Sequence, residues 1–364
     1  MSDSVRQLAG LRGLAALAVV LHHATVTVSH GARGLPGQIF VDLFFVLSGY
    51  VMCLAYMRAA DRPIRWHAFA AARFARLYPL HLFTAATAAL VTVLLPPSGE
   101  AAPVWLDAPQ LVKELTLTMA FPWHGQAGAV NAPAWSISVE WWTYFLVFPV
   151  LSVVLPRVRR WLLPLLFLGG PALLVAIALS SKGLWIVGGI AFARAATGFA
   201  AGVAVCLFAR GTKRRPSALF TDLLCAAVFG LIYLWSIAVG NDAWFLAPAF
   251  PLLIWALAEG EPASLWQRAL ASGPVVFLGA ISYSIYLDHP IIVMLLAHAD
   301  PFGVVRSDVP MCLTTVVLTL PVAALTWRWI ECPAQRTLRG AATRSTPAPA
   351  APPPRGEAAA VAGR

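Results

Sequence analysis

Two ionisable residues, Arg12 and His23, lie in the apolar run near the start of the chain, LAGLRGLAALAVVLHHATVTV. Eleven residues of α-helix turn through about 1100°, so both side chains share one helix face, about 16 Å apart along the axis. An ionisable group inside a membrane-spanning helix costs several kcal/mol, so it usually has a partner or a function. An imidazole can accept a proton from a hydroxyl during acyl transfer, and a guanidinium can bind an anion. The pair predicts a buried reaction site joined to a site for a charged ligand.

Acidic residues in two later apolar runs are candidate partners for His23. Asp42 lies in QIFVDLFFVLSGYVMCLAYM, and an aspartate can hold the tautomer of a histidine and stabilise its imidazolium. The alternative for Asp42 is a solvated carboxylate at a helix end. Glu140 lies in AWSISVEWW, too far into its apolar run for an ordinary loop acid, so we expect it to be paired or functional. His22 points about 100° away from His23, and we expect it to pack or to bond a neighbouring helix.

Two arginines, Arg73 and Arg76, are three residues apart in FAAARFARLYPLHLF and are therefore neighbours on one helix face. Such a pair suits phosphate binding, and the alternative is that both anchor the helix at the cytoplasmic surface. Arg194 lies inside a later apolar run, where it could pair with an acid within the membrane. The chain has no GxSxG, P-loop or HExxH motif, so serine-hydrolase, nucleotide-hydrolysing and zinc-peptidase activities lack support. Its five cysteines include no CxxC pair, and we expect no metal site.

Membrane-spanning helices are the elements that must position these residues. Of the 364 residues, 59% are hydrophobic and 12% are charged, about half the charge of a soluble domain. Repeated apolar runs of roughly 18 to 25 residues predict an all-α polytopic membrane protein with about ten transmembrane helices. The loop 97–133, after the third span, could cap a cavity that faces away from the cytoplasm. The predicted spans are 8–28, 38–57, 77–96, 134–155, 161–180, 186–209, 219–238, 244–258, 275–298 and 311–330.

The basic residues predict the orientation of these spans. With alternating spans, the loops on the far side hold only Arg33, Lys113, Lys182 and Arg306, and nearly all other basic residues outside the spans share the side of the N-terminus. This bias places both termini in the cytoplasm. The net charge of +10 is then a topology signal, and we expect no nucleic-acid partner. Residues 1–338 should form one transmembrane domain, and the Ala- and Pro-rich residues 339–364 a disordered cytoplasmic tail.

Six segments of the chain together resemble the acyltransferase-3 family of integral membrane O-acyltransferases. The resemblance covers residues from about 7 to 338, and six motifs in order, with the Arg-to-His spacing intact, make it specific. The segments are LAGLRGLAALAVVLHHA, VDLFFVLSGYV, ARFARLYPL, AWSISVEWW, FLGAISYSIYLDHP and IECPAQR.

The resemblance implies O-acyl transfer, often acetyl transfer, to hydroxyls of carbohydrates or of natural products such as macrolides, with acyl-CoA as the usual donor. No bound cofactor is implied, because acyl-CoA is a co-substrate. The implied location is the bacterial cytoplasmic (inner) membrane, with the donor on the cytoplasmic side. The family's essential Arg and His fall on Arg12 and His23, its RxxR motif on Arg73 and Arg76, and its Trp- and Glu-bearing motif on Trp135 to Glu140. Its motifs also supply candidate substrate-binding residues, which are Trp135, Ser136, Tyr283 and His289.

The chain departs from the family's pattern in its first motif, which has Ala9 where many members have an acid. We expect His23 to be the general base, assisted by Arg12 and by Asp42 or Glu140, and an acyl-histidine relay is the competing mechanism. A proton-coupled transporter or flippase could use the same intramembrane charges, and a structural subunit of a glycan-export complex could use them to hold helices together.

Overall fold

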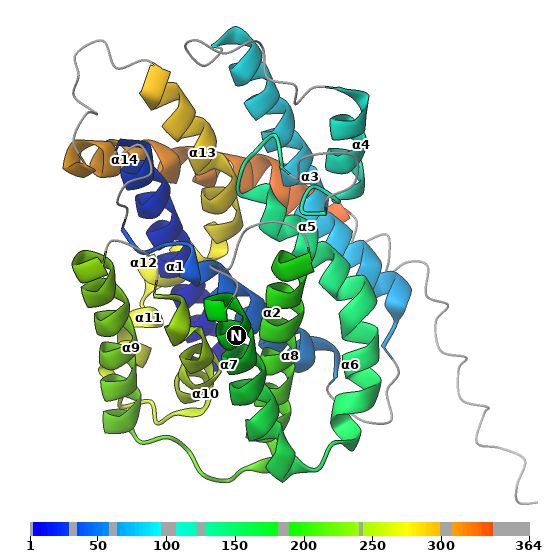
Figure 1. Cartoon of the computed structure of the whole chain (residues 1–364), viewed down its shortest axis with the longest axis vertical. Coiled ribbons are helices and arrows are strands. Elements are labelled where there is room, and N and C mark those ends of the chain that lie inside the picture. The colour runs from blue at the N-terminus through cyan, green and yellow to red at the C-terminus, as the bar shows by residue number, and fades with distance from the viewer. Residues whose placement is uncertain are drawn as a thin grey trace, which may run out of the picture.

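The computed structural model describes residues 3–28, 35–57, 64–95, 107–121, 128–180, 189–239, 243–298 and 308–337, and these residues form helices joined by short connections, without a strand (Figure 1). The predicted tail, residues 339–364, lies outside this part of the chain. The first helices are α1 (Asp3–Val28), α2 (Ile39–Tyr56), α3 (Trp66–Leu94), α4 (Ala108–Thr116), α5 (Ala134–Trp142), a π-helical turn (Thr143–Val147) and α6 (Phe148–Val154). The later helices are α7 (Leu163–Ser180), α8 (Gly189–Gly211), α9 (Ala218–Val239), α10 (Phe250–Glu259), α11 (Leu265–Leu270), α12 (Gly273–Ala280), α13 (Ser282–His298) and α14 (Asp308–Thr326), which continues as a π-helical turn (Trp327–Glu331).

Seven helical segments of the described chain are long and apolar enough to cross a membrane, and the bent pair α12–α13 makes an eighth if it counts as one span. The predicted class, a multi-pass helical membrane protein, therefore agrees with the structure. The predicted number of about ten is not confirmed. Two of the apolar runs, Arg160–Ala176 and Trp244–Glu259, are apolar helices that this count leaves out because of their length, and the second begins as a 3₁₀ turn.

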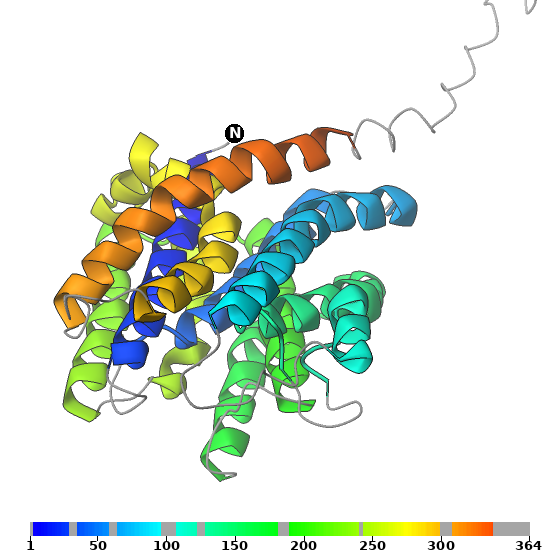
Figure 2. The ribbon, with the colours of Figure 1, turned by 90° about the horizontal axis from the view of Figure 1, so that it is seen from above.

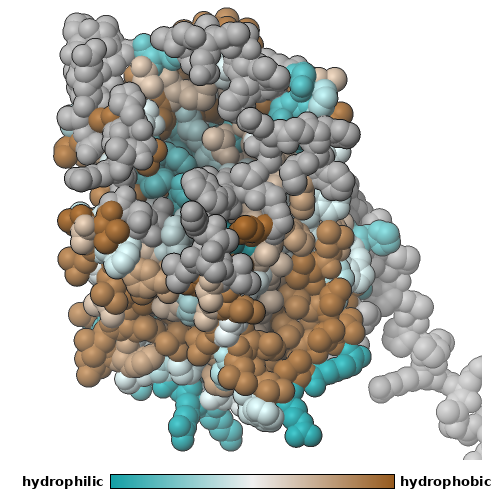
Figure 3. Space-filling view, in the orientation of Figure 1, coloured by the Kyte–Doolittle hydropathy of each residue, from teal (hydrophilic) through white to brown (hydrophobic). Residues whose placement is uncertain are grey.

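The surface supports the assignment to a membrane. Brown, apolar residues cover much of the lower part of the face in Figure 3, and polar residues gather at its bottom edge. Many large apolar side chains of α6, α7, α9 and α14 are exposed, which suits contact with lipid and would be unfavourable in water. Examples are Val150, Leu165, Leu173, Leu223, Leu234 and Val317.

Small residues let the central helices approach closely. A Cβ atom on Gly49 of α2 would lie 2.0 Å from the carbonyl oxygen of Phe199 in α8, and one on Gly202 of α8 would lie 2.0 Å from that of Val46. Such backbone contact requires glycine and is typical of helix pairs in membranes. It places α2 and α8 against each other at the core of the bundle.

The first helix packs in the same way against the bent pair α12–α13. A Cβ on Gly279 would lie 2.0 Å from the carbonyl oxygen of Ala9 in α1. The pair is bent by 68° just after this glycine. Figure 2 shows α14 running along the outside of α1 and α13, so that both helices are enclosed between α14 and the rest of the bundle. This arrangement brings Arg12 against α12 and His23 against α13.

Candidate active site

A cavity of about 270 Å³ opens between α1, α2, α3, α5 and α13. We call it the arginine-lined cavity, because Arg12, Arg73 and Arg76 all line it. Glu140 contributes a carboxylate to the wall of this cavity, and the other polar groups of the wall are hydroxyls. These hydroxyls belong to Ser48, Ser136, Tyr144, Ser282, Tyr283 and Tyr286. Predicted site residues from four separate motifs therefore meet in one space.

Glu140 is held by two hydroxyl groups inside this cavity. Its Oε1 accepts hydrogen bonds from Ser48 Oγ at 2.7 Å and from Tyr144 Oη at 2.6 Å. Tyr144 follows Glu140 by one turn and lies in the π-helical turn, a distortion that often marks functional sites. The spacing of four residues could have predicted this bond, whereas Ser48 comes from α2 and is brought in by packing alone. Glu140 is thus paired, as expected, but with hydroxyls and not with His23.

The three arginines of the cavity differ in their partners. Arg76 forms an ion pair with Glu331, which is only 1% exposed, and its guanidinium lies 5.2 Å from the centre of the Tyr283 ring. The ion pair thus lies inside the protein and not at its surface. Because Glu331 already neutralises Arg76, this arginine is partly committed to holding the C-terminal helix against α3.

Arg12 and Arg73 keep unused hydrogen-bonding capacity. Arg12 donates from Nη2 to the carbonyl oxygen of Gly279 at 2.8 Å, at the bend between α12 and α13, but its Nε is buried without a partner. The Nε of Arg73 is likewise buried without a partner, and its guanidinium lies 5.6 Å from the centre of the Tyr144 ring. Buried donors without acceptors are costly, so both side chains are suited to an anionic ligand.

The candidate substrate-binding residues separate into two groups. Ser136 and Tyr283 line the cavity, where Ser136 Oγ lies 2.8 Å from Tyr286 Oη and Tyr283 donates to the carbonyl oxygen of Leu77 at 2.7 Å. Trp135 is not part of the cavity wall, and its ring lies 5.6 Å from the guanidinium of Arg194. Helical periodicity accounts for this separation, because the adjacent residues Trp135 and Ser136 lie about 100° apart around the axis of α5.

Asp42 forms a buried ion pair with Arg194 of α8, and this corrects the expected contact with His23. Arg194 Nη2 and Nε lie 2.8 and 3.1 Å from the two carboxylate oxygens. The guanidinium also lies 4.4 Å from the centre of the Trp244 ring. The prediction that Arg194 pairs with an intramembrane acid is confirmed. Since both carboxylate oxygens are engaged by this arginine, Asp42 is a structural link between α2 and α8.

His23 contacts a second histidine instead of an acid. Its Nδ1 lies 2.9 Å from Nε2 of His289 in α13, and the two rings stack with centres 5.0 Å apart. We call these two residues the histidine pair. Neither lines the arginine-lined cavity, so His289 is not placed with the other candidate substrate-binding residues. His22 lies beside the pair, and its Nδ1 bonds the carbonyl oxygen of Leu35 at 2.6 Å.

An apolar layer separates the histidine pair from the cavity. Ala16 and Val20 lie between Arg12 and His23 on α1 and pack against Ile281 and Ile285. Phe44 of α2 joins this cluster, lines the cavity, and has its ring centre 5.9 Å from that of Tyr286. The two predicted centres thus lie along one helix, at two ends of a packed segment.

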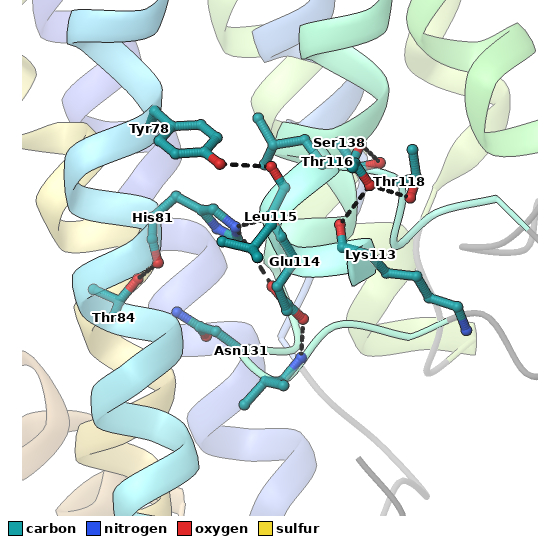
Figure 4. Close-up of polar contacts among 12 residues, drawn as sticks. Tyr78, His81, Thr84, Lys113, Glu114, Leu115, Thr116, Thr118, Asn131 and Ser138 are labelled. Atoms are coloured by element: carbon teal, nitrogen blue, oxygen red, sulfur yellow. Dashed lines mark hydrogen bonds and ion pairs between the residues drawn. The ribbon is translucent and has the colours of Figure 1, made fainter. Parts of the chain in front are cut away.

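A further buried polar cluster lies where the loop 97–133 returns to the bundle (Figure 4). His81 of α3 points toward α4, with Nε2 3.4 Å from Glu114 Oε2, and Glu114 Oε1 accepts from the backbone N–H of Val130 at 2.7 Å. Burial raises the pKa of the Glu114 carboxyl. Asn131 then donates to the carbonyl oxygen of Leu287 in α13 at 2.8 Å. This cluster fastens the segment that leads into α5, and the residue types alone did not indicate it.

Sequence comparison matches the same elements to one family. The family described as "Acyltransferase domain" matches residues 5–328, which include every helix around the cavity. This chain belongs to that acyltransferase family. Acyltransferase MdmB of Streptomyces mycarofaciens is 30% identical over 309 residues, which are 78% of this chain and 77% of that protein. Protein 2 in the picA locus of Rhizobium radiobacter is 39% identical over 96 residues, covering 26% of this chain and 49% of that protein.

No solved structure matches the acyltransferase. In the described part of the chain, no group of three or more His, Cys, Asp or Glu side chains could hold a metal ion.

Proposed function

We propose that the acyltransferase moves an acyl group, acetyl in the simplest case, from acyl-CoA to a hydroxyl of a glycan or of a glycosylated metabolite. The observation that carries the proposal is the charge of the arginine-lined cavity. Three guanidinium groups line it against one carboxylate, and Glu331 neutralises only Arg76. A ligand bearing several phosphates and a narrow arm, such as CoA, suits both this charge and the apolar remainder of the wall.

His23 is the general base of the proposed reaction. Its imidazole removes the proton of the acceptor hydroxyl while that oxygen attacks the thioester carbonyl carbon. An ester C–O bond forms, the C–S bond breaks, and the CoA thiolate leaves and takes up the proton that His23 holds. Histidine suits this exchange because its pKa lies near neutrality in water.

The donor must reach from the cavity to His23. Eleven residues separate Arg12 and His23 on α1, about 16 Å along the axis, and an extended pantetheine arm could span such a gap. The apolar layer around Phe44 and Tyr286 lies in the way. The proposal therefore requires that this layer opens when the donor binds, with Phe44 as the side chain that must move.

Glu140 serves the cavity in this proposal and not the histidine. Its carboxylate is close enough to Arg12 to interact electrostatically, and its two hydroxyl partners fix its position. It thus holds the cationic wall together before an anionic donor arrives. Asp42, paired with Arg194, has no part in the chemistry.

The test uses proteoliposomes of the full chain, labelled acetyl-CoA, and an extract of glycolipids and small glycosides from cells in which the protein naturally occurs. The wild type should place alkali-labile label on an acceptor, and His23→Ala should lose about 100-fold or more of this transfer at equal protein amount. The matched control is His22→Asn, whose amide can keep the bond to the Leu35 carbonyl oxygen and which should retain transfer.

Two outcomes would contradict the proposal. Full transfer by His23→Ala would exclude the histidine as base, and absence of acceptor ester in the wild type would favour a transporter. A third experiment separates the two chemical routes: labelled acetyl-CoA is supplied without acceptor. Protein-bound label that later moves to acceptor would replace direct transfer by an acyl-histidine relay.

A further inference from the structure

The hydrogen bonds of the histidine pair determine which nitrogen of each ring carries hydrogen. His289 Nδ1 lies 3.0 Å from the backbone carbonyl oxygen of Ile285. A carbonyl oxygen can only accept, so His289 Nδ1 must be the donor and must carry the hydrogen. In the neutral imidazole, the other nitrogen, Nε2, then has a lone pair and can only accept.

The same donor–acceptor rule also determines the tautomer of His23. Its Nδ1 lies 2.9 Å from Nε2 of His289, which accepts, so His23 Nδ1 must be protonated. The Nε2 of a neutral His23 therefore carries the lone pair. The contact between the two rings engages Nδ1 of His23, and His23 is only partly buried, so Nε2 is the nitrogen that remains for a hydroxyl.

We propose that His289 is a positioning residue that holds His23 in the tautomer in which Nε2 can act as the base. An aspartate performs this task in Ser-His-Asp triads, where it accepts a hydrogen bond from the Nδ1–H of the histidine. Here a neutral imidazole accepts it. The inference rests on the proposed function, in which His23 is the base, and it assigns to His289 a role other than substrate binding.

The surroundings leave no carboxylate to perform this task. Three acids of the described helices have other partners: Asp42 bonds Arg194, Glu140 bonds Ser48 and Tyr144, and Asp288 accepts from Thr326 at 2.6 Å. The aromatic neighbours are His22, with its ring centre 5.3 Å from that of His23, and Tyr286, 6.1 Å from that of His289. His289 is thus the side chain that orients the His23 ring.

The backbone around His289 is fixed from two sides. The carbonyl oxygen of Leu287 accepts from Asn131, which joins α13 to the segment leading into α5, and Asp288 joins α13 to α14 through Thr326. His289 itself is fully buried. A base is more effective when its orienting partner is rigid, so these contacts explain why α13 carries several polar residues within the membrane domain.

Two substitutions of His289 separate a positioning role from a purely structural one. His289→Leu keeps a similar volume but cannot accept a hydrogen bond from His23. In His289→Gln the side-chain oxygen can replace Nε2 as the acceptor. We expect His289→Leu to lower kcat about 100-fold with KM for acetyl-CoA changed less than about threefold, since the donor binds elsewhere. His289→Gln should recover about tenfold of that loss, which is the value of one charge-assisted hydrogen bond.

The control is again His22→Asn. Every variant is assayed at equal protein amount, and its thermal midpoint in detergent is measured to show that it is folded. Equal activity of His289→Leu and wild type, or equal loss in the Leu and Gln variants with normal midpoints, would overturn the inference. A rise of KM for acceptor without a change of kcat in His289→Leu would do so too, because it indicates substrate binding. If His23→Ala remains active, the proposed function fails instead, whatever the His289 variants show.

Discussion

The arginine-lined cavity and the histidine pair share helix α1 but differ in every physical respect. The cavity holds cations with unused donors, a carboxylate held by two hydroxyls, and a volume of about 270 Å³. The histidine pair holds two rings in contact with no charged partner among the described residues. The first region carries excess positive charge, and the second consists of two imidazole rings that are hydrogen-bonded to each other. Under the proposed function, this difference means that donor binding and base catalysis are separated along one helix, with an apolar layer between them.

The largest expected effect tests whether Arg76 belongs to binding or to the fold. Arg76→Gln leaves Glu331 buried without its cation, which costs about 3–5 kcal/mol of unfolding free energy. The thermal midpoint of the purified protein should fall strongly. The second substitution Glu331→Gln, added to Arg76→Gln, should restore much of it, because neither residue then leaves a buried charge. An undiminished midpoint in Arg76→Gln would mean that Arg76 is a binding residue like its neighbours.

A smaller effect is expected at Arg73, and it should appear in a different measurement. Arg73→Gln removes a cation with an unused donor, so the KM for acetyl-CoA should rise about 10- to 100-fold, corresponding to 1.5–3 kcal/mol for a hydrogen bond to a charged group. The thermal midpoint should change little. Arg65→Gln is the control, since this exposed arginine at the start of α3 is outside the cavity wall. A loss of kcat at unchanged KM would contradict the assignment of donor binding to the cavity and of the chemical step to the histidine pair.

The smallest effect concerns the polar cluster around Glu114, which lies outside both regions. Burial raises the pKa of Glu114 above its ordinary value of 4.5, so the folded state binds its proton more tightly than the unfolded state. The stability of the protein should therefore decrease as the pH rises from that value through the folded pKa. Glu114→Gln removes this contribution, because the amide is neutral at every pH.

Thermal midpoints between pH 4 and 8 measure the effect, and the slope against pH should be smaller in Glu114→Gln than in the wild type. The kcat and KM values should stay the same in both. A variant with the wild-type slope would show that Glu114 is not the titrating group. A variant with altered kcat would connect this cluster to the histidine pair, through Asn131 and α13.

The sequence by itself determined the class of the protein and the residues that share a helix face. Apolar runs identified the helical membrane class, and six ordered motifs identified the acyltransferase family that the comparison confirmed. The positions of Arg12 and His23 follow from helical periodicity, which is a local property of the chain. The common location of Arg73 and Arg76 on the wall of one cavity also follows from their spacing.

Only the tertiary structure decided the partners. Asp42 lies 152 residues from Arg194 in the chain, and His23 lies 266 residues from His289. Periodicity says which way a side chain points, but the neighbouring helix depends on where glycines such as Gly49 and Gly279 let backbones meet. These helix contacts pair Asp42 with an arginine, Glu140 with two hydroxyl groups, and His23 with a second histidine.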